Sequence, residues 1–298
     1  MLDFRLKVFD TVAKRLSFTR AAEELYITQP AVTKHIRELE AYFKTSLIER
    51  SGNRKVSLTP AGRILLAYAE QIASVYKGLE FEMNALVNKH SGVLRIGAST
   101  TVAQYVLPPV LAGFHERFKD VKVILVTGNT EQVEEALLKK EIDLGIIEGM
   151  TRQPQISYQE FGKDELVLVS SISNQKLKKY VLKPEELKNY PFLLREPGSG
   201  TLEFIAYALK ERDIRLNDLN VEMQLGSTES MKSYLLNSNC IAFLSVHAIV
   251  KELKSGECRI VDVEGLSITR PFHFIQPLGH PLPLAELFQR FSSTYRLS

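Results

Sequence analysis

The sequence predicts an α+β protein of several domains: a small helical head with a β-hairpin, a long linker helix, and a two-lobed α/β body. Three observations predict it. Residues 17–43 have the pattern of two short helices joined by a tight turn. Apolar residues then repeat every three or four positions through residues 65–86, and beyond residue 91 apolar strands alternate with amphipathic helices. The 298 residues are enough for two or three domains with their own cores.

A helical hairpin is expected at residues 17–43, after a first helix at residues 2–16. Ser17 is suited to cap the first helix of the pair, because its hydroxyl can accept a free amide of the first turn. Thr28 is suited to cap the second helix, and Pro30 lies in its first turn, where a missing amide costs little. On this second helix, one apolar face should be buried: Val32, Ile36, Leu39 and Phe43.

The other face of this helix carries Gln29, Thr33, Lys34 and Arg37, which should meet solvent. Gln can pair with adenine through two hydrogen bonds, and Arg and Lys reach guanine or phosphate oxygens. An ordinary amphipathic hairpin with a charged outer side is the alternative. Two capped helices, a short turn and this choice of side chains favour a helix that binds in a DNA groove.

A β-hairpin is expected next, with strands at residues 47–50 and 55–58 around the turn Ser51–Arg54. Arg50, Arg54 and Lys55 surround its tip and are candidates for phosphate contact. Charge supports this: residues 1–63 hold twelve Lys or Arg against seven Asp or Glu, whereas the remaining 235 residues hold 26 against 28. A basic head on a near-neutral body favours a polyanionic partner.

A long helix is expected from Thr59-Pro60 to about Asn88. Its apolar residues form a heptad seam, which is typical of a coiled coil and favours a dimer over a helix packed only on its own domain. The predicted dimer contacts are Leu65, Ile72, Tyr76, Leu79, Met83 and Leu86.

Two α/β lobes joined by paired crossovers near residues 161–165 and 266–270 are expected to form the body. Ligands of such sheets bind at the carboxyl ends of strands, beside helix N-termini. The predicted domains are the head at 1–59, the linker at 60–90 and the body at 91–298, with lobe I at 91–162 plus 268–298 and lobe II at 163–267.

Composition argues against several other classes. No apolar run is long enough to cross a membrane and no signal-peptide core is present, so a cytoplasmic location is expected. Cys240 and Cys258 are expected to be reduced, and no zinc site or other metal site is predicted. The scattered histidines and the absence of a phosphate-loop lysine argue against an enzyme, and no cofactor is expected.

Several segments together resemble the LysR-type transcriptional regulators, and the resemblance covers essentially the whole chain. In the head they are Phe9–Ala13, Ser17–Leu25, Thr28–Lys34, Ile36–Glu40 and Leu58–Gly62. In the body they are Leu94–Gly97, Asp143–Ile146 and Arg195–Thr201, the last of which is similar to the branch with regulators of sulfur assimilation and carbon fixation.

The resemblance implies a winged helix-turn-helix, a dimerisation helix and a periplasmic-binding-protein-like sensor domain. Expected partners are double-stranded promoter DNA, further copies of the chain as a homodimer and homotetramer, and a small effector, with RNA polymerase as a candidate and no membrane. By position, Ser17, Thr28, Gln29, Pro30, Thr33, Lys34 and Arg37 would lie at the DNA, with the hairpin on phosphates.

Polar turns should converge between the lobes in the implied fold, where hydroxyls and free amides at helix starts favour a small anion. Glu148 could select an amine or hydroxyl of the same molecule. The alternative for each Ser or Thr is a helix cap without a ligand. The candidate effector residues are Ser99, Thr100, Thr101, Asn129, Glu148, Arg195, Ser199, Thr201 and Thr228.

Two other classes of protein are alternatives to a regulator. A solute-binding protein would explain the body but has no use for a basic head. An architectural DNA-binding protein would explain the head but not a two-lobed sensor. An operator affinity that responds to a metabolite separates the regulator from both.

Overall fold

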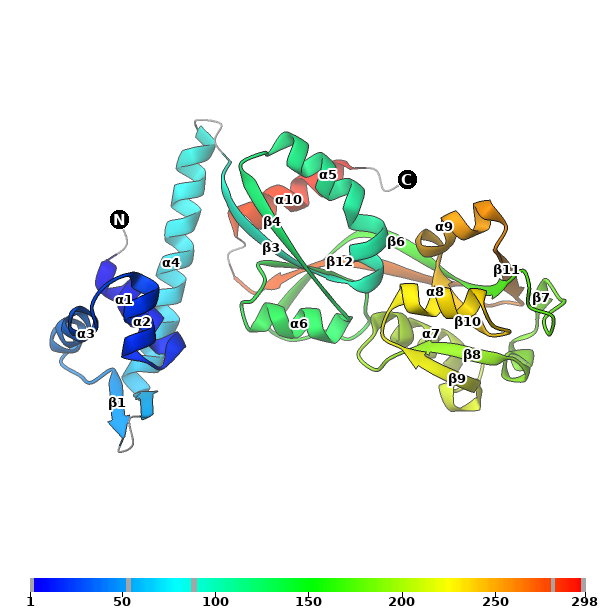
Figure 1. Ribbon diagram of the computed structural model, residues 1–298, viewed down its shortest axis with the longest axis horizontal. Helices are drawn as coiled ribbons and strands as arrows, with labels where there is room; N and C mark the ends of the chain where they lie inside the picture. Colours follow the sequence, from blue (N-terminus) through cyan, green and yellow to red (C-terminus); the bar gives the residue numbers. More distant parts are fainter. Residues whose placement is uncertain (1–2, 52–54, 87–89, 280–281, 296–298) are drawn as a thin grey trace. The chain divides into compact units, whose positions relative to one another are not determined.

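The computed structural model describes residues 3–51, 55–86, 90–279 and 282–295. The chain forms two compact units, Met1–Lys89 and His90–Ser298. In the first unit the elements in chain order (Figure 1) are α1 (Phe4–Arg15), α2 (Phe18–Leu25), α3 (Gln29–Phe43), β1 (Ile48–Ser51), β2 (Lys55–Leu58) and α4 (Pro60–Leu86).

The core of the first unit lies among α1, α2 and α3. Both predicted caps are present: the Ser17 hydroxyl accepts the Arg20 amide at 3.3 Å and the Thr28 hydroxyl accepts the Ala31 amide at 3.4 Å. The predicted apolar face of α3 is confirmed at three positions, which are buried: Val32, Ile36 and Leu39.

The prediction for Phe43 was wrong, because this side chain is 45% exposed. Phe43 is the last residue of α3, and Lys44 then leaves the helix with a left-handed φ of 53°. The Phe43 ring packs edge-on against Tyr42, with the ring centroids 5.0 Å apart, rather than against the head core. The apolar pattern of α3 therefore extends one turn beyond the last residue that packs in the core.

The hairpin β1–β2 is antiparallel and leads directly into α4. The Thr59 hydroxyl caps this helix by accepting the Gly62 amide at 2.9 Å. A Cβ at Gly62 would lie 2.1 Å from the Leu47 carbonyl oxygen, so only glycine permits this close approach of α4 to the strand. The beginning of α4 packs on the head, where Leu65 contacts the core and Ala69 is buried.

The second unit is the two-lobed α/β body that the sequence predicts (Figure 1). Its elements in chain order are β3 (Gly92–Ser99), η1 (Val102–Val106), α5 (Leu107–Arg117), β4 (Val121–Gly128), α6 (Thr130–Leu138), β5 (Leu144–Ile147), β6 (Ile156–Ser171), β7 (Val181–Leu182), η2 (Pro184–Asn189), β8 (Pro191–Arg195), α7 (Gly200–Lys210), η3 (Leu216–Asp218), β9 (Asn220–Leu225), α8 (Thr228–Leu236), β10 (Ile241–Ser245), α9 (Val246–Ser255), β11 (Cys258–Val263), β12 (Ile268–Pro277) and α10 (Pro283–Thr294).

One sheet path connects the lobes, with strands in the order β4-β3-β5-β12-β6-β10-β8-β9. In lobe I, β3 pairs in parallel with β4 and β5, and in lobe II β8 pairs in parallel with β9 and β10. Between them the long strands β6 and β12 run antiparallel through both lobes, as Figure 1 shows. The predicted crossover near residues 161–165 lies inside β6, and the one near 266–270 lies at the start of β12. Arg270 stands opposite Asp164 in the register of these two strands.

Each lobe has its own apolar core. In lobe I, α5 and α10 cover β3 through residues such as Phe114 and Phe288, whose ring centroids are 5.0 Å apart. In lobe II, α7 packs on β8 through residues such as Ile205. Both cysteines are free and buried in lobe II.

Candidate functional site

The solvent-facing side of α3 presents the polar side chains that the sequence predicts there. Gln29, Pro30, Lys34 and Arg37 are exposed, and Thr33 is partly buried. The Lys34 ammonium lies 3.9 Å from Glu38, and its side chain is 75% exposed, so it can reach another partner. A shallow open hollow runs along this face and is lined by Gln29, Pro30, Thr33, Lys34, Arg37, Glu38 and Ala41.

The structure does not describe the side chains of the hairpin residues that are predicted to contact DNA. Arg54 lies outside the described residues. For Arg50 and Lys55 the structure describes the backbone of β1 and β2, where Arg50 pairs with Val56 and Lys55 with Ser51. The two strands therefore carry these positions to the tip of the hairpin.

An apolar stripe is exposed along α4 and overlaps the predicted heptad seam. Its members are between 45% and 66% exposed and are spaced by four, four, three, four and four residues: Ile64, Tyr68, Ile72, Val75, Leu79 and Met83. Three of them belong to the predicted dimer contacts. Leu65 instead contacts the head core, Tyr76 is partly buried, and the Leu86 side chain is outside the description.

The nine candidate effector residues all lie in the second unit, and each is at most 9% exposed. In lobe I, Ser99 ends β3, Thr100 and Thr101 follow it, Asn129 precedes α6 and Glu148 follows β5. In lobe II, Arg195 ends β8, Ser199 and Thr201 are at the start of α7, and Thr228 begins α8. Strand ends and helix starts thus gather these side chains where the lobes meet.

Arg195 is the cationic part of this site. Its Nη1 donates to the Thr100 hydroxyl at 2.9 Å and to the Thr228 hydroxyl at 3.4 Å. Its Nε and Nη2 donate to the two carboxylate oxygens of Glu196 at 2.8 and 2.9 Å. The Arg195 side chain is 2% exposed, whereas that of Glu196 is 24% exposed. A buried guanidinium from lobe II thereby holds a hydroxyl from lobe I.

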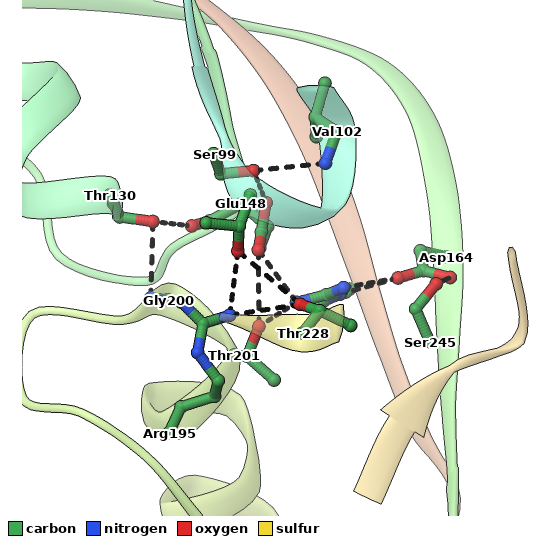
Figure 2. Close-up of polar contacts among 12 residues, drawn as sticks. Ser99, Val102, Thr130, Glu148, Asp164, Arg195, Gly200, Thr201, Thr228 and Ser245 are labelled. Carbon is green, nitrogen blue, oxygen red and sulfur yellow. Dashed lines mark hydrogen bonds and ion pairs between the residues drawn. The ribbon is translucent and has the colours of Figure 1, made fainter. Parts of the chain in front are cut away.

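Glu148 is the anionic part of the site, as Figure 2 shows. Its carboxylate accepts hydrogen bonds from the Ser99 hydroxyl, from the Thr201 hydroxyl at 3.3 Å and from Arg270 Nη1 at 3.0 Å. Arg270 also donates from Nε to Asp164 at 2.8 Å, and Asp164 accepts the Ser245 hydroxyl at 2.8 Å. A buried acid–arginine–acid chain therefore lies between the lobes.

Helix capping accounts for some of these polar residues but not for others. Asn129 caps α6 by accepting the Gln132 amide at 3.0 Å, and it also donates to Glu196 across the lobes at 3.3 Å. Ser199 and Thr101 precede α7 and η1, but neither hydroxyl caps its helix. The cap-only interpretation therefore fails for Thr101 and Ser199.

A second contact joins the lobes beside this site. The Tyr105 hydroxyl of η1 donates to Glu229 of α8, and the Lys232 ammonium lies 5.3 Å from the centroid of the Tyr105 ring. Burial and the neighbouring Glu229 carboxylate raise the pKa of Tyr105, so its hydroxyl stays a donor.

The sequence analysis missed Asp164 and Arg270. Both carried a usable signal. Along β12 the alternate residues Ile268, Arg270 and Phe272 are buried, so they share one face of the strand. On β6 the alternate residues Asp164 and Leu166 are buried in the same way. A charged residue on the apolar face of a strand needs a buried partner, which marks both as site residues.

Within the described residues, no group of three or more His, Cys, Asp or Glu side chains is placed to hold a metal ion. Over the same part of the chain no helix is long and apolar enough to cross a membrane.

Comparisons with known proteins agree with this architecture. Residues 4–63 match the family described as bacterial regulatory helix-turn-helix protein, lysR family, and residues 88–294 match the LysR substrate binding domain. The HTH-type transcriptional regulator CysL of Bacillus subtilis is 31% identical, over 95% of this chain and 94% of CysL. The RuBisCO operon transcriptional regulator of Acidithiobacillus ferrooxidans is 30% identical, over 96% of this chain and 92% of that protein.

A solved structure adds a bound ligand to the comparison. The regulatory domain of CcmR from Synechocystis PCC6803, in complex with 2-PG, superimposes with a TM-score of 0.62 and is 25% identical. The match covers 68% of this chain and 97% of the CcmR chain. With both family domains present in order along the chain, this protein belongs to the LysR family and is a DNA-binding transcriptional regulator with a C-terminal effector-binding domain.

Proposed function

We propose that this regulator responds to a small anionic metabolite held between its lobes by Arg195, Thr100 and Thr228. The observation that carries the proposal is the buried Arg195 guanidinium, which contacts a hydroxyl from each lobe at 2.9 and 3.4 Å. A guanidinium matches the geometry of carboxylates and phosphates. An anion bound there would touch both lobes and so could change the equilibrium between their arrangements.

The other candidate effector residues would complete this site. The dipoles of α7 and α8 favour an anion at their starts, and the hydroxyls of Thr101 and Ser199 are not used as caps. The complex of the related CcmR domain with 2-PG supports a small molecule as the class of effector. The remaining proposed contacts are Ser99, Asn129, Glu148 and Thr201.

For DNA, we assign promoter recognition to the exposed face of α3. Gln29, Thr33, Lys34 and Arg37 would read base edges or nearby phosphates, and the hairpin would contact the backbone with Arg50, Arg54 and Lys55. Ser17, Thr28 and Pro30 would fix the helix starts. This assignment rests on the exposure of the α3 side chains and on the basic head.

For assembly, the α4 stripe would join two chains as a homodimer. A dimer would place two recognition helices about 34 Å apart, one turn of DNA. A homotetramer, as the family resemblance implies, would bring four heads to one promoter, with RNA polymerase as a further partner. The predicted domains, with the head at 1–59 and the linker at 60–90, fit this arrangement.

Two other roles are less well supported. The relatives named above are transcriptional regulators, which supports a regulatory role over a catalytic one and a place in the cytoplasm. An architectural DNA-binding protein would need neither a two-lobed domain nor a buried arginine between its lobes.

The test is thermal unfolding of the full chain with a panel of small acids: sulfate, sulfite, thiosulfate, acetylserine, phosphorylated sugars and carboxylates. A ligand at about a hundred times its dissociation constant stabilises by roughly 2.7 kcal/mol, which is readily seen. A hit should also change the affinity for selected DNA, and Arg195→Met should abolish both effects. Sequence-blind DNA binding that ignores the whole panel would favour the architectural role.

A further inference from the structure

Glu148 places a negative charge inside the site proposed for an anion. Five charged side chains meet there: Glu148, Asp164, Arg195, Glu196 and Arg270. Three are acids and two are arginines, so the cluster has a formal charge of −1 before any effector binds. An effector that brought only negative charge would add to an excess that burial already makes unfavourable.

The Glu148 carboxylate cannot simply leave when an effector arrives. The Thr130 hydroxyl donates to the Glu148 backbone carbonyl at 2.5 Å and accepts the Gly200 amide at 3.2 Å. A Cβ at Gly200 would lie 1.8 Å from the same carbonyl oxygen, so α7 packs directly against this backbone. The Glu148 backbone is therefore fixed, and its carboxylate is held by Ser99, Thr201 and Arg270, so an effector must meet it in place (Figure 2).

The acidic and cationic parts of the site are close together. Ser99 and Thr100 are consecutive at the end of β3, and Ser99 donates to Glu148 while Thr100 accepts from Arg195. Consecutive α-carbons are about 3.8 Å apart. A molecule with only a few non-hydrogen atoms can therefore reach both parts at once.

We propose that the effector is a small acid that also carries a hydroxyl or ammonium group within a few bonds of its acid group. Its acid group binds at Arg195, Thr100 and Thr228, and its hydroxyl or ammonium group donates to Glu148. This inference rests on the proposed function and adds a chemical class to it. Glu148 is then the specificity-determining residue of the site.

The test compares pairs of acids that differ only in the donor group, by calorimetric titration of the full chain. The pairs are glycolate with acetate, L-lactate and L-alanine with propionate, and 3-phosphoglycerate with its 2-deoxy analogue. We expect the member with the donor group to bind at least about tenfold more tightly, because its analogue leaves the Glu148 carboxylate without that hydrogen bond.

Two variants test whether the preference for acids with a donor group depends on Glu148. Glu148→Gln keeps the shape and can still accept from a hydroxyl, so it should reduce the preference for an ammonium more than that for a hydroxyl. The substitution also removes the excess negative charge of the cluster and leaves Arg270 paired with Asp164. The protein should therefore stay folded. Thr100→Val is the matched control, because it should weaken both members of a pair alike and leave their ratio unchanged.

The outcomes separate this inference from the proposed function. Equal binding of both members of every pair would overturn the inference and leave an anion-sensing regulator. Binding of no acid at all would overturn the proposed function, and the inference with it. Tighter binding of plain and substituted acids alike to Glu148→Gln would mean that Glu148 competes with the effector, which also contradicts the inference.

Discussion

Arg270 is the residue at which the charges of the two lobes meet. Its Nη2 lies 2.6 Å from Asp164 and its Nη1 lies 3.0 Å from Glu148, and all three side chains are at most 2% exposed. Buried ion pairs are stable only when their geometry and hydrogen bonds offset the loss of water. Here the hydroxyls of Ser99, Thr201 and Ser245 complete the hydrogen bonding of the two acids.

Replacing Arg270 should therefore be severe. Arg270→Met leaves both carboxylates buried without a counterion, and we expect a loss of about 3–5 kcal/mol in the free energy of unfolding. Urea titration followed by circular dichroism measures it. Glu148→Gln serves for comparison and should lose much less, because Arg270 keeps Asp164. Similar small losses for both variants would contradict the coupling of these charges.

The exposed face of α3 is expected to contact DNA bases. Lys34→Ala and Arg37→Ala should each weaken binding to an operator, selected from random DNA with the wild-type protein, by on the order of 1–3 kcal/mol if they contact bases. Fluorescence anisotropy with the operator and with random DNA measures the loss. The loss should be larger on the operator, because base contacts are made only there.

Lys7 of α1 provides the control, because it is exposed and its replacement by Ala removes the same charge from a different helix. Lys7→Ala should change operator affinity less than Lys34→Ala does. Equal losses on operator and random DNA for Lys34→Ala would assign that side chain to phosphates instead of bases.

Among the elements, α4 exposes a row of large apolar side chains from Ile64 to Met83. Periodicity predicted a seam through Leu65, but it could not show which side the head would cover. The head core takes Leu65, and the exposed stripe begins instead at Ile64 and Tyr68. Which apolar side of a long helix faces its own domain depends on contacts that lie far apart in sequence.

A charge within this stripe should separate the chains of a dimer. Leu79→Glu places a carboxylate at a position that is 55% exposed in the single chain and would be buried in the proposed pair. We expect a dimer dissociation constant at least tenfold higher, since burying an unpaired charge is unfavourable. Analytical ultracentrifugation measures it. Ala67→Glu adds the same charge outside the stripe and should leave the assembly intact, whereas equal effects would place the interface elsewhere.

Most of the elements follow from local patterns, whereas the centre of the site does not. Capping residues and periodicity predict α2, α3 and α4, and strand-end polar residues predict the positions that gather between the lobes. The partnership of Arg270 with Asp164 depends on the register between β6 and β12, which are about a hundred residues apart. No local pattern encodes that register. The sequence does show that Asp164 and Arg270 each alternate with apolar residues.

For the whole molecule, regulation requires that effector and DNA influence one another. The proposed effector contacts come from both lobes, so binding there favours one arrangement of the second unit. The head belongs to the other compact unit, and the chain joins the two through α4. An effector can change DNA affinity only as far as it binds the two states of the protein with different affinity.

Such coupling is reciprocal, which gives a quantitative prediction. If an acid from the panel changes operator affinity by some factor, operator DNA must change the affinity for that acid by the same factor, typically 5–150-fold. Anisotropy with and without the acid gives the first factor, and calorimetry with and without the operator gives the second. A plain acid that does not bind, at the same ionic strength, controls for screening of the phosphates.

Thr101→Val should reveal whether the lobes transmit this coupling. The Thr101 hydroxyl is buried beside η1 and does not cap it, so the substitution removes a proposed effector contact without removing a cap. Affinity for the acid should fall, and a higher concentration should then restore the same change in operator affinity. If Thr101→Val binds the acid as tightly as the wild-type protein does, Thr101 is not part of the effector site.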